Sequence, residues 1–416
     1  MLNGTVPVAF TVAAVKRIIC LHSQVKFHFM SILQIFDCEC KLTVLMSKLH
    51  LFSYRIPFRK PFRNAARIFY YREGFIMGDG NRIWTEIAPL PGFSTDNLQD
   101  VWTCLKNNHS AIQDHFNNRT LSRYLRENTT STELKRLPSI AFGLSLLHEQ
   151  QAACDRNISL FQHWSGKKSD SGIKCNAVCG LSDLPEVLSQ IDEFSSKGYE
   201  TIKLKIPGNA GEAESYILNI CNKFPGVTFR FDANAKLSKT DAHKLLQKLG
   251  NHRAGGAVNN LEYIEEPVKW KTLQDIHDLR TYGIPVAADE SARTAEQIRK
   301  ITKTRAFDAL VIKPMLTGSF EELKLIWKVS TATVISSSLE TAIGRQLIAN
   351  LALYLNHFIN NTHGLATGHM LASDLGSNLI PDRPDISIPD LPGAGFSGDV
   401  TLKDQDSETI KIERII

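Results

Sequence analysis

Residues 201–206 read Thr-Ile-Lys-Leu-Lys-Ile and hold the pattern that decides the fold. Successive side chains of a β-strand point to opposite faces, so Lys203 and Lys205 share one face and three aliphatic side chains share the other. A half-exposed antiparallel strand shows the same alternation. In a barrel, however, the aliphatic face packs on helices and the lysines point inward. Inward lysines need carboxylate partners, and the next three predicted strands each end in one.

Four further charged residues end the apolar runs that follow Lys205, at intervals of 24 to 33 residues. Each interval accommodates one strand, one helix and two loops, which is the repeat of a (β/α) barrel. Side chains at the carboxyl ends of barrel strands face one mouth, where barrel enzymes carry out their chemistry. The four residues are Asp232, Glu265, Asp289 and Lys313.

Strand and helix signals alternate from about residue 173 to residue 367. This α/β pattern implies parallel strands with right-handed crossovers, closed as a barrel when eight strands are present; an open doubly wound sheet is the alternative. The predicted strands are 174–179, 201–206, 228–232, 262–265, 286–289, 309–313, 333–337 and 363–367. The predicted helices are 184–197, 213–223, 239–249, 273–282, 295–302, 320–328 and 342–358.

Residues 46–160 show strands followed by helices rather than alternation, which predicts a separate α+β capping domain. Its signals are a hairpin turn at 78–81, a proline-rich loop at 89–93, and helices at 96–107, 110–116 and 139–154. We expect residues 161–385 to form the barrel and residues 386–416 to complete the capping domain.

Residues 1–45 fall outside both predicted domains. They hold three of the eight cysteines and few turn or capping signals. Three interpretations compete: an extension created by an upstream start codon, an organelle-targeting leader, and an added structural element. Asp37 and Glu39 are the only acids in the segment, which is compatible with a leader, but its arginine content is low.

The overall composition is that of an ordinary globular protein, with 43% hydrophobic and 22% charged residues. The formal charge of +5 is mild, but residues 46–72 hold seven lysines and arginines and no acid. Such a basic segment can be a solvated face, a nucleic-acid or membrane surface, or the rim of a site for an anionic metabolite.

The eight cysteines lack the paired spacing of a zinc site, which predicts a reduced cytoplasmic protein with buried thiols. Lys16 and Arg17 interrupt the longest apolar candidate for a membrane span, residues 6–21, and no signal-peptide cleavage pattern follows it.

Asp232, Glu265 and Asp289 supply three hard oxygen ligands from adjacent strand ends. Such a set suits Mg²⁺, with Mn²⁺ as a substitute. Each acid taken alone is more typical of a helix cap or a surface position. Acids at three successive strand ends indicate a shared site.

The order of the motifs KxK, DAN, EEP, DES and KP resembles that of the enolase superfamily, whose lysine bases work with Mg²⁺. The segments WTEIAPLPGFSTDNL (84–98), IKPMLTGS (312–319) and SSSLE (336–340) resemble the o-succinylbenzoate synthase family in its proteobacterial form, over about residues 46–400. The resemblance implies a (β/α)7β barrel with an N-terminal capping domain. It also implies a lyase of menaquinone biosynthesis that dehydrates 2-succinyl-6-hydroxy-2,4-cyclohexadiene-1-carboxylate to 2-succinylbenzoate.

The resemblance further implies roles for the lysines. Lys205 would be the general base that removes the α-proton and the acid that returns it to the departing hydroxide. Its pKa would be lowered by the metal, by Lys203 and by partial burial. Lys313 would stay cationic and stabilise the enediolate.

Substrate contacts are less specific in the sequence. Loops 59–64 and 90–93 would cover the mouth, and Arg63, Ser336 and Ser337 are candidate anion partners. An exposed rim arginine and ordinary strand packing explain these residues equally well.

Two alternatives stay open. An N-acylamino acid racemase or dipeptide epimerase of the same superfamily would use Lys205 and Lys313 as base and acid on opposite faces of the α-carbon. Dipeptide epimerases generally carry an acidic DxD-like element near the last strand, which residues 365–368 lack. The alternative from another class is a non-catalytic barrel, either structural or binding nucleic acid through the basic segment. A small anionic substrate is the expected partner, without nucleic acid or a membrane span, and the sequence leaves the oligomeric state open.

Overall fold

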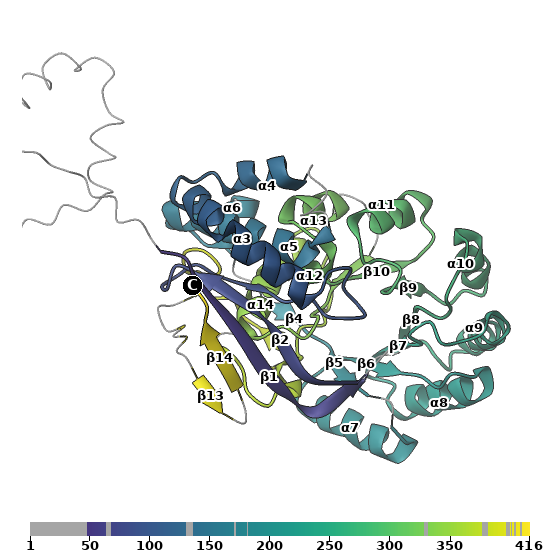
Figure 1. The fold of residues 1–416 in the computed structure, drawn as a ribbon. Helices are drawn as coiled ribbons and strands as arrows, with labels where there is room; N and C mark the ends of the chain where they lie inside the picture. Colours follow the sequence, from purple (N-terminus) through teal and green to yellow (C-terminus); the bar gives the residue numbers. More distant parts are fainter. Residues whose placement is uncertain are drawn as a thin grey trace, which may run out of the picture. The chain divides into compact units, whose positions relative to one another are not determined.

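The computed structural model describes residues 48–63, 68–129, 136–169, 172–180, 182–327, 332–376, 382–396, 400, 402, 405–407 and 410–416. The chain divides into two units, Met1–Met46 and Ser47–Ile416. The first unit lies outside the described residues, and so does the predicted extension 1–45. The second unit contains an antiparallel sheet with its helices and a barrel of parallel strands (Figure 1).

Seven parallel strands form one sheet in the order β11-β10-β9-β8-β7-β6-β5, so strands adjacent in the chain are adjacent in space. The register sets Lys205 beside Asp232, and Asp232 beside Glu265. The strands are β5 (Ala177–Cys179), β6 (Thr201–Lys205), β7 (Thr228–Asp232), β8 (Leu261–Glu265), β9 (Val286–Ala288), β10 (Ala309–Ile312) and β11 (Ala332–Ile335).

The segment around His363 closes this sheet into a barrel. On one side, His363 N donates to Lys174 O at 2.8 Å; on the other, Gly364 N donates to Ile335 O at 2.9 Å. These bonds exclude an open doubly wound sheet. A full strand over 363–367 was predicted, but only His363 and Gly364 form bridges, because the chain turns back where Thr367 N donates to Leu365 O.

Helices follow the strands and pack on the outside of the barrel (Figure 1). Side-chain caps fix several starts: Asp183, Asn209, Ser238 and Thr294 each accept a hydrogen bond from the backbone N–H three residues later. The helices are α7 (Leu184–Ser196), α8 (Ala210–Lys223), α9 (Lys239–Ala254), α10 (Leu273–Arg280), α11 (Ala295–Thr304), α12 (Pro314–Thr317), α13 (Phe320–Trp327) and α14 (Ala342–Asn356).

The capping region is built on an antiparallel sheet in the order β13-β14-β1-β2-β3, so C-terminal strands pair with an N-terminal one. Its strands are β1 (His50–Arg63), β2 (Ile68–Gly78), β3 (Trp84–Ile87), β13 (Gln405–Ser407) and β14 (Ile410–Arg414), and its helices are α3 (Leu98–Asn117), α4 (Leu121–Thr129), α5 (Pro138–Asp155) and α6 (Leu160–Ser165). A short pair, β4 (Ile173–Lys174) with β12 (Asp385–Ile386), and the 3-10 turn η2 (Gly368–Met370) complete the elements.

Helix α3 corrects one prediction. The sequence suggested two helices, 96–107 and 110–116, but the structure has one. The buried side chains Cys104, Leu105, Ile112 and Phe116 continue along one face, and the polar residues between them lie on the other. A polar stretch without glycine or proline therefore does not end this helix.

Glu86 on β3 joins the capping sheet to the barrel. Its fully buried carboxylate accepts hydrogen bonds from Thr341 Oγ1 at 2.5 Å and Gly344 N at 3.0 Å, at the start of α14, and from the Tyr54 hydroxyl at 2.5 Å. Burial raises the pKa of Glu86, although Arg72 opposes the shift. An acceptor at a helix N-terminus satisfies N–H groups that otherwise have no partner.

Arg72 is the residue of the basic segment with the clearest structural role. It is 1% exposed, and its guanidinium donates to the carbonyl oxygens of Ala88 at 2.6 Å, Pro89 at 2.9 Å and Leu339 at 3.0 Å. These bonds tie β2 to the loop after β3 and to the barrel loop before α14. Arg72 is therefore not part of a solvated basic face.

All five cysteines in the described part of the chain are free, and four of them are buried. Among the helices that the structure describes, none combines the length and apolar character needed to cross a membrane.

The barrel closure predicts acid sensitivity. His363 is fully buried; its Nδ1 lies 3.0 Å from Ile335 N as acceptor, and its Nε2 lies 2.9 Å from Asn356 Oδ1. Burial lowers the pKa of His363 from 6.5 to about 3. Because the unfolded chain then binds the proton more tightly, stability should fall as the pH drops below 6.5, by roughly 5 kcal/mol at about pH 3. Urea unfolding between pH 7.5 and pH 4 measures this slope.

The matched variant is His363→Asn, which keeps a short polar side chain but cannot titrate. It should be less stable at pH 7 and show a shallower loss of stability on acidification. An unchanged slope in this variant would mean that other groups cause the acid sensitivity.

The division of the chain predicts that protein starting at Met46 keeps its fold, since the described sheet and barrel contain no residue before 48. Circular dichroism and the midpoint of thermal unfolding should match those of the full chain. Insoluble protein, or a midpoint lower by more than a few degrees, would show that residues 1–45 pack against the second unit.

Candidate active site

The structure brings the predicted charged residues together at one end of the barrel. Lys205, Asp232 and Glu265 are the last residues of β6, β7 and β8, and Asp289 and Lys313 directly follow β9 and β10. Parallel strands in register end at the same rim, so residues far apart in the chain become neighbours. The ion pairs described next join Asp232 and Glu265 through Lys203, and join Lys313 to Asp289.

Lys203 lies between two carboxylates. Its Nζ is 2.5 Å from Glu265 Oε1 and 3.0 Å from Asp232 Oδ2. Burial acts to lower the pKa of Lys203, but these acids outweigh it and raise the pKa well above its usual range. Lys203 is therefore a fixed cation inside the barrel, as the alternation of residues 201–206 predicted.

Lys313 pairs with Asp289. Its Nζ lies 2.5 Å from Asp289 Oδ1 and also contacts Oδ2. Burial lowers the pKa of Lys313, Asp289 raises it, and the net direction is upward. The ammonium also lies 5.4 Å from the centre of the Phe93 ring, a cation–π contact with a loop of the capping region. Lys313 is held as a cation.

Lys205 behaves in the opposite way. Burial lowers its pKa, and the nearby Lys203 and Lys236 add to that effect, while Asp232 and Glu290 oppose it. A lowered pKa makes the neutral amine accessible, which a general base requires. The two lysines at this mouth are thus in different electrostatic environments.

The three acids offer carboxylate oxygens, the ligands that a hard cation prefers, but they are not grouped as a metal site. Among the described residues, no three acidic, histidine or cysteine side chains stand close enough together to hold a metal ion. Lys203 and Lys313 instead form ion pairs with all three acids. The fully buried Glu265 Oε2, however, has no hydrogen-bond partner among the described residues. Burial, reinforced by Asp232 and Asp289 against the effect of Lys203, raises the pKa of Glu265 well above its usual range. Additional positive charge beside Glu265 would stabilise the unpartnered oxygen and lower the pKa of this carboxyl group.

Glu266 positions the loop after β9. Its Oε2 accepts hydrogen bonds from Asp289 N at 3.0 Å and Ser291 N at 3.1 Å, and its Oε1 accepts one from the Ser291 hydroxyl. Trp270 Nε1 donates to the same hydroxyl. Burial raises the pKa of Glu266 to about 7. Its backbone φ of +40° is unusual for a non-glycine residue and indicates a conformation held by these bonds.

Asn234 performs a similar task after β7. Its backbone N donates to Asp232 Oδ1 at 2.8 Å, and its Nδ2 donates to Asp232 Oδ2 at 3.0 Å and to Glu290 Oε1 at 3.3 Å. Both oxygens of Asp232 are therefore oriented by the residue two positions later. This explains the DAN motif in physical terms.

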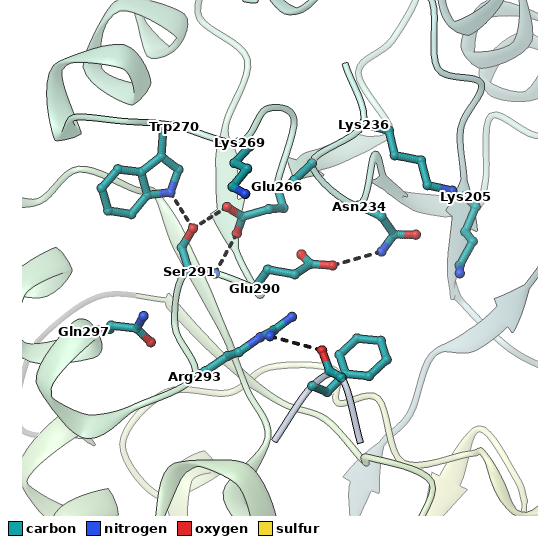
Figure 2. A pocket seen from close by; sticks show the side chains of 13 residues that line it. Lys205, Asn234, Lys236, Glu266, Lys269, Trp270, Glu290, Ser291, Arg293 and Gln297 are labelled. Atoms are coloured by element: carbon teal, nitrogen blue, oxygen red, sulfur yellow. Dashed lines mark hydrogen bonds between the residues drawn. The ribbon is translucent and has the colours of Figure 1, made fainter. Parts of the chain in front are cut away.

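A cavity of about 500 Å³ opens beside these groups (Figure 2). Phe93 from the capping region and Lys205 from the barrel both line it, so the two regions share the site. Its other lining residues are Gly92, Asn234, Ala235, Lys236, Glu266, Lys269, Trp270, Glu290, Ser291, Arg293 and Gln297.

The two predicted serine contacts do not line this cavity. Ser337 is buried, and its hydroxyl donates to Glu340 Oε2 at 2.7 Å and accepts from Thr367 Oγ1 at 2.9 Å. Ser336 lies beside Gly364 in the barrel closure. Neither lines the cavity of Figure 2, and the side chain of Arg63 lies outside the described residues. These three assignments stay predictions.

Glu266, Glu290, Trp270 and Arg293 line the cavity but were not among the predicted site residues. Glu266 and Glu290 had a visible signal, since each directly follows a predicted metal ligand in EEP and DES. Trp270 and Arg293 had none, because their approach depends on how two loops fold across the mouth.

Two family models match the chain. The Enolase C-terminal domain-like family matches residues 186–401, and the MenC, N-terminal domain family matches residues 46–151. The first covers more than half of the chain and includes all three acids and all three lysines discussed above.

Individual relatives are distant. The chain is 27% identical over 285 residues to an o-succinylbenzoate synthase of Citrobacter koseri, covering 67% of this chain and 77% of the relative. It is 23% identical over 363 residues to an L-Ala-D/L-Glu epimerase of Francisella tularensis, covering 82% and 96%. Among solved structures, a dipeptide epimerase from Enterococcus faecalis complexed with Mg and the dipeptide L-Leu-L-Tyr matches with a TM-score of 0.69 at 18% identity, covering 84% of this chain and 99% of the other.

The match to this solved structure shows the fold, a capped (β/α)7β barrel. The two family models show that the sequence is related as well. Several o-succinylbenzoate synthases are related to the chain at 24–27% identity. The chain therefore belongs to the Enolase C-terminal domain-like family, as an o-succinylbenzoate synthase-like member of the enolase superfamily.

Proposed function

We propose that this chain is an o-succinylbenzoate synthase, which dehydrates 2-succinyl-6-hydroxy-2,4-cyclohexadiene-1-carboxylate to 2-succinylbenzoate in menaquinone biosynthesis. The observation that carries the proposal is the inequality of the two lysines. Burial lowers the pKa of Lys205, whereas Asp289 holds Lys313 as a cation. A syn dehydration needs one base and one fixed cation, while racemisation needs two acid–base groups. The match of residues 46–151 to the MenC N-terminal family supports the same choice.

The chemistry follows from these two lysines. Neutral Lys205 takes the proton from the ring carbon that bears the carboxylate, and the electron pair of that C–H bond moves into an enediolate. Lys313 lies near the developing negative charge as a cation. The electrons then return to the ring, the C–O bond to the hydroxyl group breaks, and the ammonium of Lys205 donates its proton to the departing hydroxide. Water and the aromatic product result.

Enolase superfamily enzymes generally use Mg²⁺, and the dipeptide epimerase of Enterococcus faecalis is complexed with Mg. We propose Asp232, Glu265 and Asp289 as the residues that would hold it here. When bound, the ion supplies Lewis-acid stabilisation of the carboxylate as it takes up charge. Two properties of Glu265 support this assignment. Among the described residues its Oε2 has no hydrogen-bond partner, and its pKa is raised.

The proposal includes an organisation of the chain. Residues 46–160 with 386–416 form the capping domain, and residues 161–385 form the barrel. The capping domain contributes Phe93 to the cavity, which helps to exclude water. The free, mostly buried cysteines are compatible with a reducing compartment, and we place the protein in the cytoplasm.

A dipeptide epimerase is the second candidate, and Glu290 is the observation that favours it. Glu290 lines the cavity, and within the described part of the chain its Oε2 has no hydrogen-bond partner. A carboxylate in that position could bind the ammonium group of a dipeptide. Two of the relatives named above are epimerases of this kind.

The first prediction separates these candidates through the lysines. Lys205→Arg should lower kcat by about 100-fold to 10,000-fold, because a guanidinium stays protonated and cannot act as base. Lys313→Arg keeps a cation beside Asp289 and should retain measurable turnover. Aromatisation of the cyclohexadiene substrate, followed by ultraviolet absorbance, measures both variants.

An epimerase would respond differently, since each lysine serves one face of the α-carbon. Equal inactivation by the two arginine substitutions, together with solvent deuterium appearing in L-Ala-L-Glu, would overturn the synthase assignment. Lys300→Arg on the exposed face of α11 is the control for the substitution itself.

The second prediction concerns the metal. Asp232→Asn, Glu265→Gln and Asp289→Asn should each weaken Mn²⁺ binding by at least about 100-fold, because changes to residues that only orient ligands already cost about 10-fold to 100-fold. Calorimetric titration with Mn²⁺ measures the affinity without requiring turnover. Asp192→Asn, on the exposed side of α7, should bind Mn²⁺ like the unaltered protein. Full turnover after extensive chelation would contradict the proposed metal requirement.

A further inference from the structure

The cavity has two cationic ends (Figure 2). Lys205 and Lys236 lie on one side, and Lys269 and Arg293 lie on the other, with Lys269 beside Trp270. We infer that Lys269 and Arg293 form a second anion subsite, which binds the distal carboxylate of a dicarboxylate substrate while its reacting carbon lies near Lys205. The inference rests on the proposed function and adds the residues that select the far end of the substrate.

The charges that line the cavity support an anionic ligand. Of the described residues that line it, four are cations and only Glu266 and Glu290 are acids. The carboxylate of Glu266 is already used by Asp289 N, Ser291 N and the Ser291 hydroxyl. In the part of the chain that the structure describes, no ion pair joins Lys269 or Arg293 to an acid. Uncompensated cations that face a cavity attract anions.

Arg293 is held in place without using most of its donors. Its Nη1 donates to Gly92 O at 3.4 Å, and its guanidinium lies 5.4 Å from the centre of the Phe93 ring. Both contacts come from the capping loop and orient the plane of the guanidinium. A guanidinium carries five N–H donors in a fork that matches the two oxygens of a carboxylate. Arg293 is therefore oriented for a bidentate ligand.

Lys269 reaches the same end from a different loop. The residue before it, Val268, forms a bridge with Lys236, which fixes the start of this loop. The residue after it, Trp270, is anchored through its indole N–H to the Ser291 hydroxyl. These contacts on both sides fix the backbone position of Lys269. Trp270 also provides an apolar wall at this side of the cavity.

Glu290 explains why the ligand should carry its charges at the ends. Figure 2 shows its carboxylate between the two cationic ends, where Asn234 Nδ2 donates to it at 3.3 Å. A carboxylate in the middle of the cavity would meet this acid, whereas one at either end would meet cations. The volume of about 500 Å³ falls in the usual range for small-molecule sites.

The test uses the product and an analogue as calorimetric ligands, with the full-length protein in excess Mg²⁺. In 2-butyrylbenzoate, a methyl group replaces the distal carboxylate of 2-succinylbenzoate and the ring carboxylate is kept. Arg293→Met and Lys269→Met should each raise the Kd of 2-succinylbenzoate about tenfold or more and leave that of 2-butyrylbenzoate nearly unchanged. Arg293→Lys should restore part of the affinity, and Lys300→Met is the control for loss of a nearby surface charge.

Two outcomes would overturn the inference. Equal weakening of both ligands would show that Arg293 only supports the Phe93 loop. Unchanged affinity for both would show that the distal carboxylate lies elsewhere.

Failure of the proposed function has a separate signature. If the unaltered enzyme epimerises L-Ala-L-Glu but does not aromatise the cyclohexadiene, the synthase proposal is wrong. The subsite is then tested with L-Ala-L-Glu against L-Ala-L-Gln, which lacks the distal charge. A rise in KM for the glutamate dipeptide alone, in Arg293→Met, would support the subsite, and an equal change for both dipeptides would overturn it.

Discussion

The barrel mouth depends on charge compensation around Lys203. Buried carboxylates on neighbouring strands repel one another, and an uncompensated buried charge is strongly unfavourable. Lys203 lies within 3.0 Å of both Asp232 and Glu265, so one ammonium allows two acids to end adjacent strands inside the barrel. The compensation is incomplete, because one buried oxygen of Glu265 has no hydrogen-bond partner in the part of the chain that the structure describes. Additional positive charge beside Glu265 would complete this compensation.

The same principle makes the two candidate catalytic lysines unequal. Lys313 has Asp289 as a direct partner and remains cationic, whereas burial and neighbouring cations lower the pKa of Lys205. The capping region contributes Phe93, whose ring lies near the cationic groups of Lys313 and Arg293. The same residue lines the cavity together with Lys205. Its position depends on the buried bonds of Glu86 and Arg72, which attach the capping sheet to the barrel. The cap therefore takes part in the electrostatics of the site as well as covering it.

Much of this arrangement was predictable. The alternation in residues 201–206 and the regular spacing of charged strand ends predicted the barrel, and six of its strands lie within one or two residues of the expected positions. The helix over 98–117 and the short closure at His363 were not predicted correctly. The helix continues because its buried face runs through a polar stretch without glycine or proline, and the closure is short because the chain turns back between Leu365 and Thr367. The pKa differences were inferred from the resemblance and from burial, and the structure shows the neighbours that produce them.

The sequence by itself determined which residues reach the mouth, because period-two alternation and strand order decide facing and adjacency in a parallel barrel. Tertiary structure alone decided how those residues are used. The loops after β8 and β9 place Trp270 and Arg293 on the cavity through contacts with Ser291 and Gly92. In sequence, Glu266 is only the neighbour of a predicted metal ligand, whereas in the structure its carboxylate supports the loop after β9. Ser337 bonds to Glu340 and does not line the cavity. The physical reason is that a side chain's partners depend on loop conformation and through-space packing, which the local pattern of a strand does not encode.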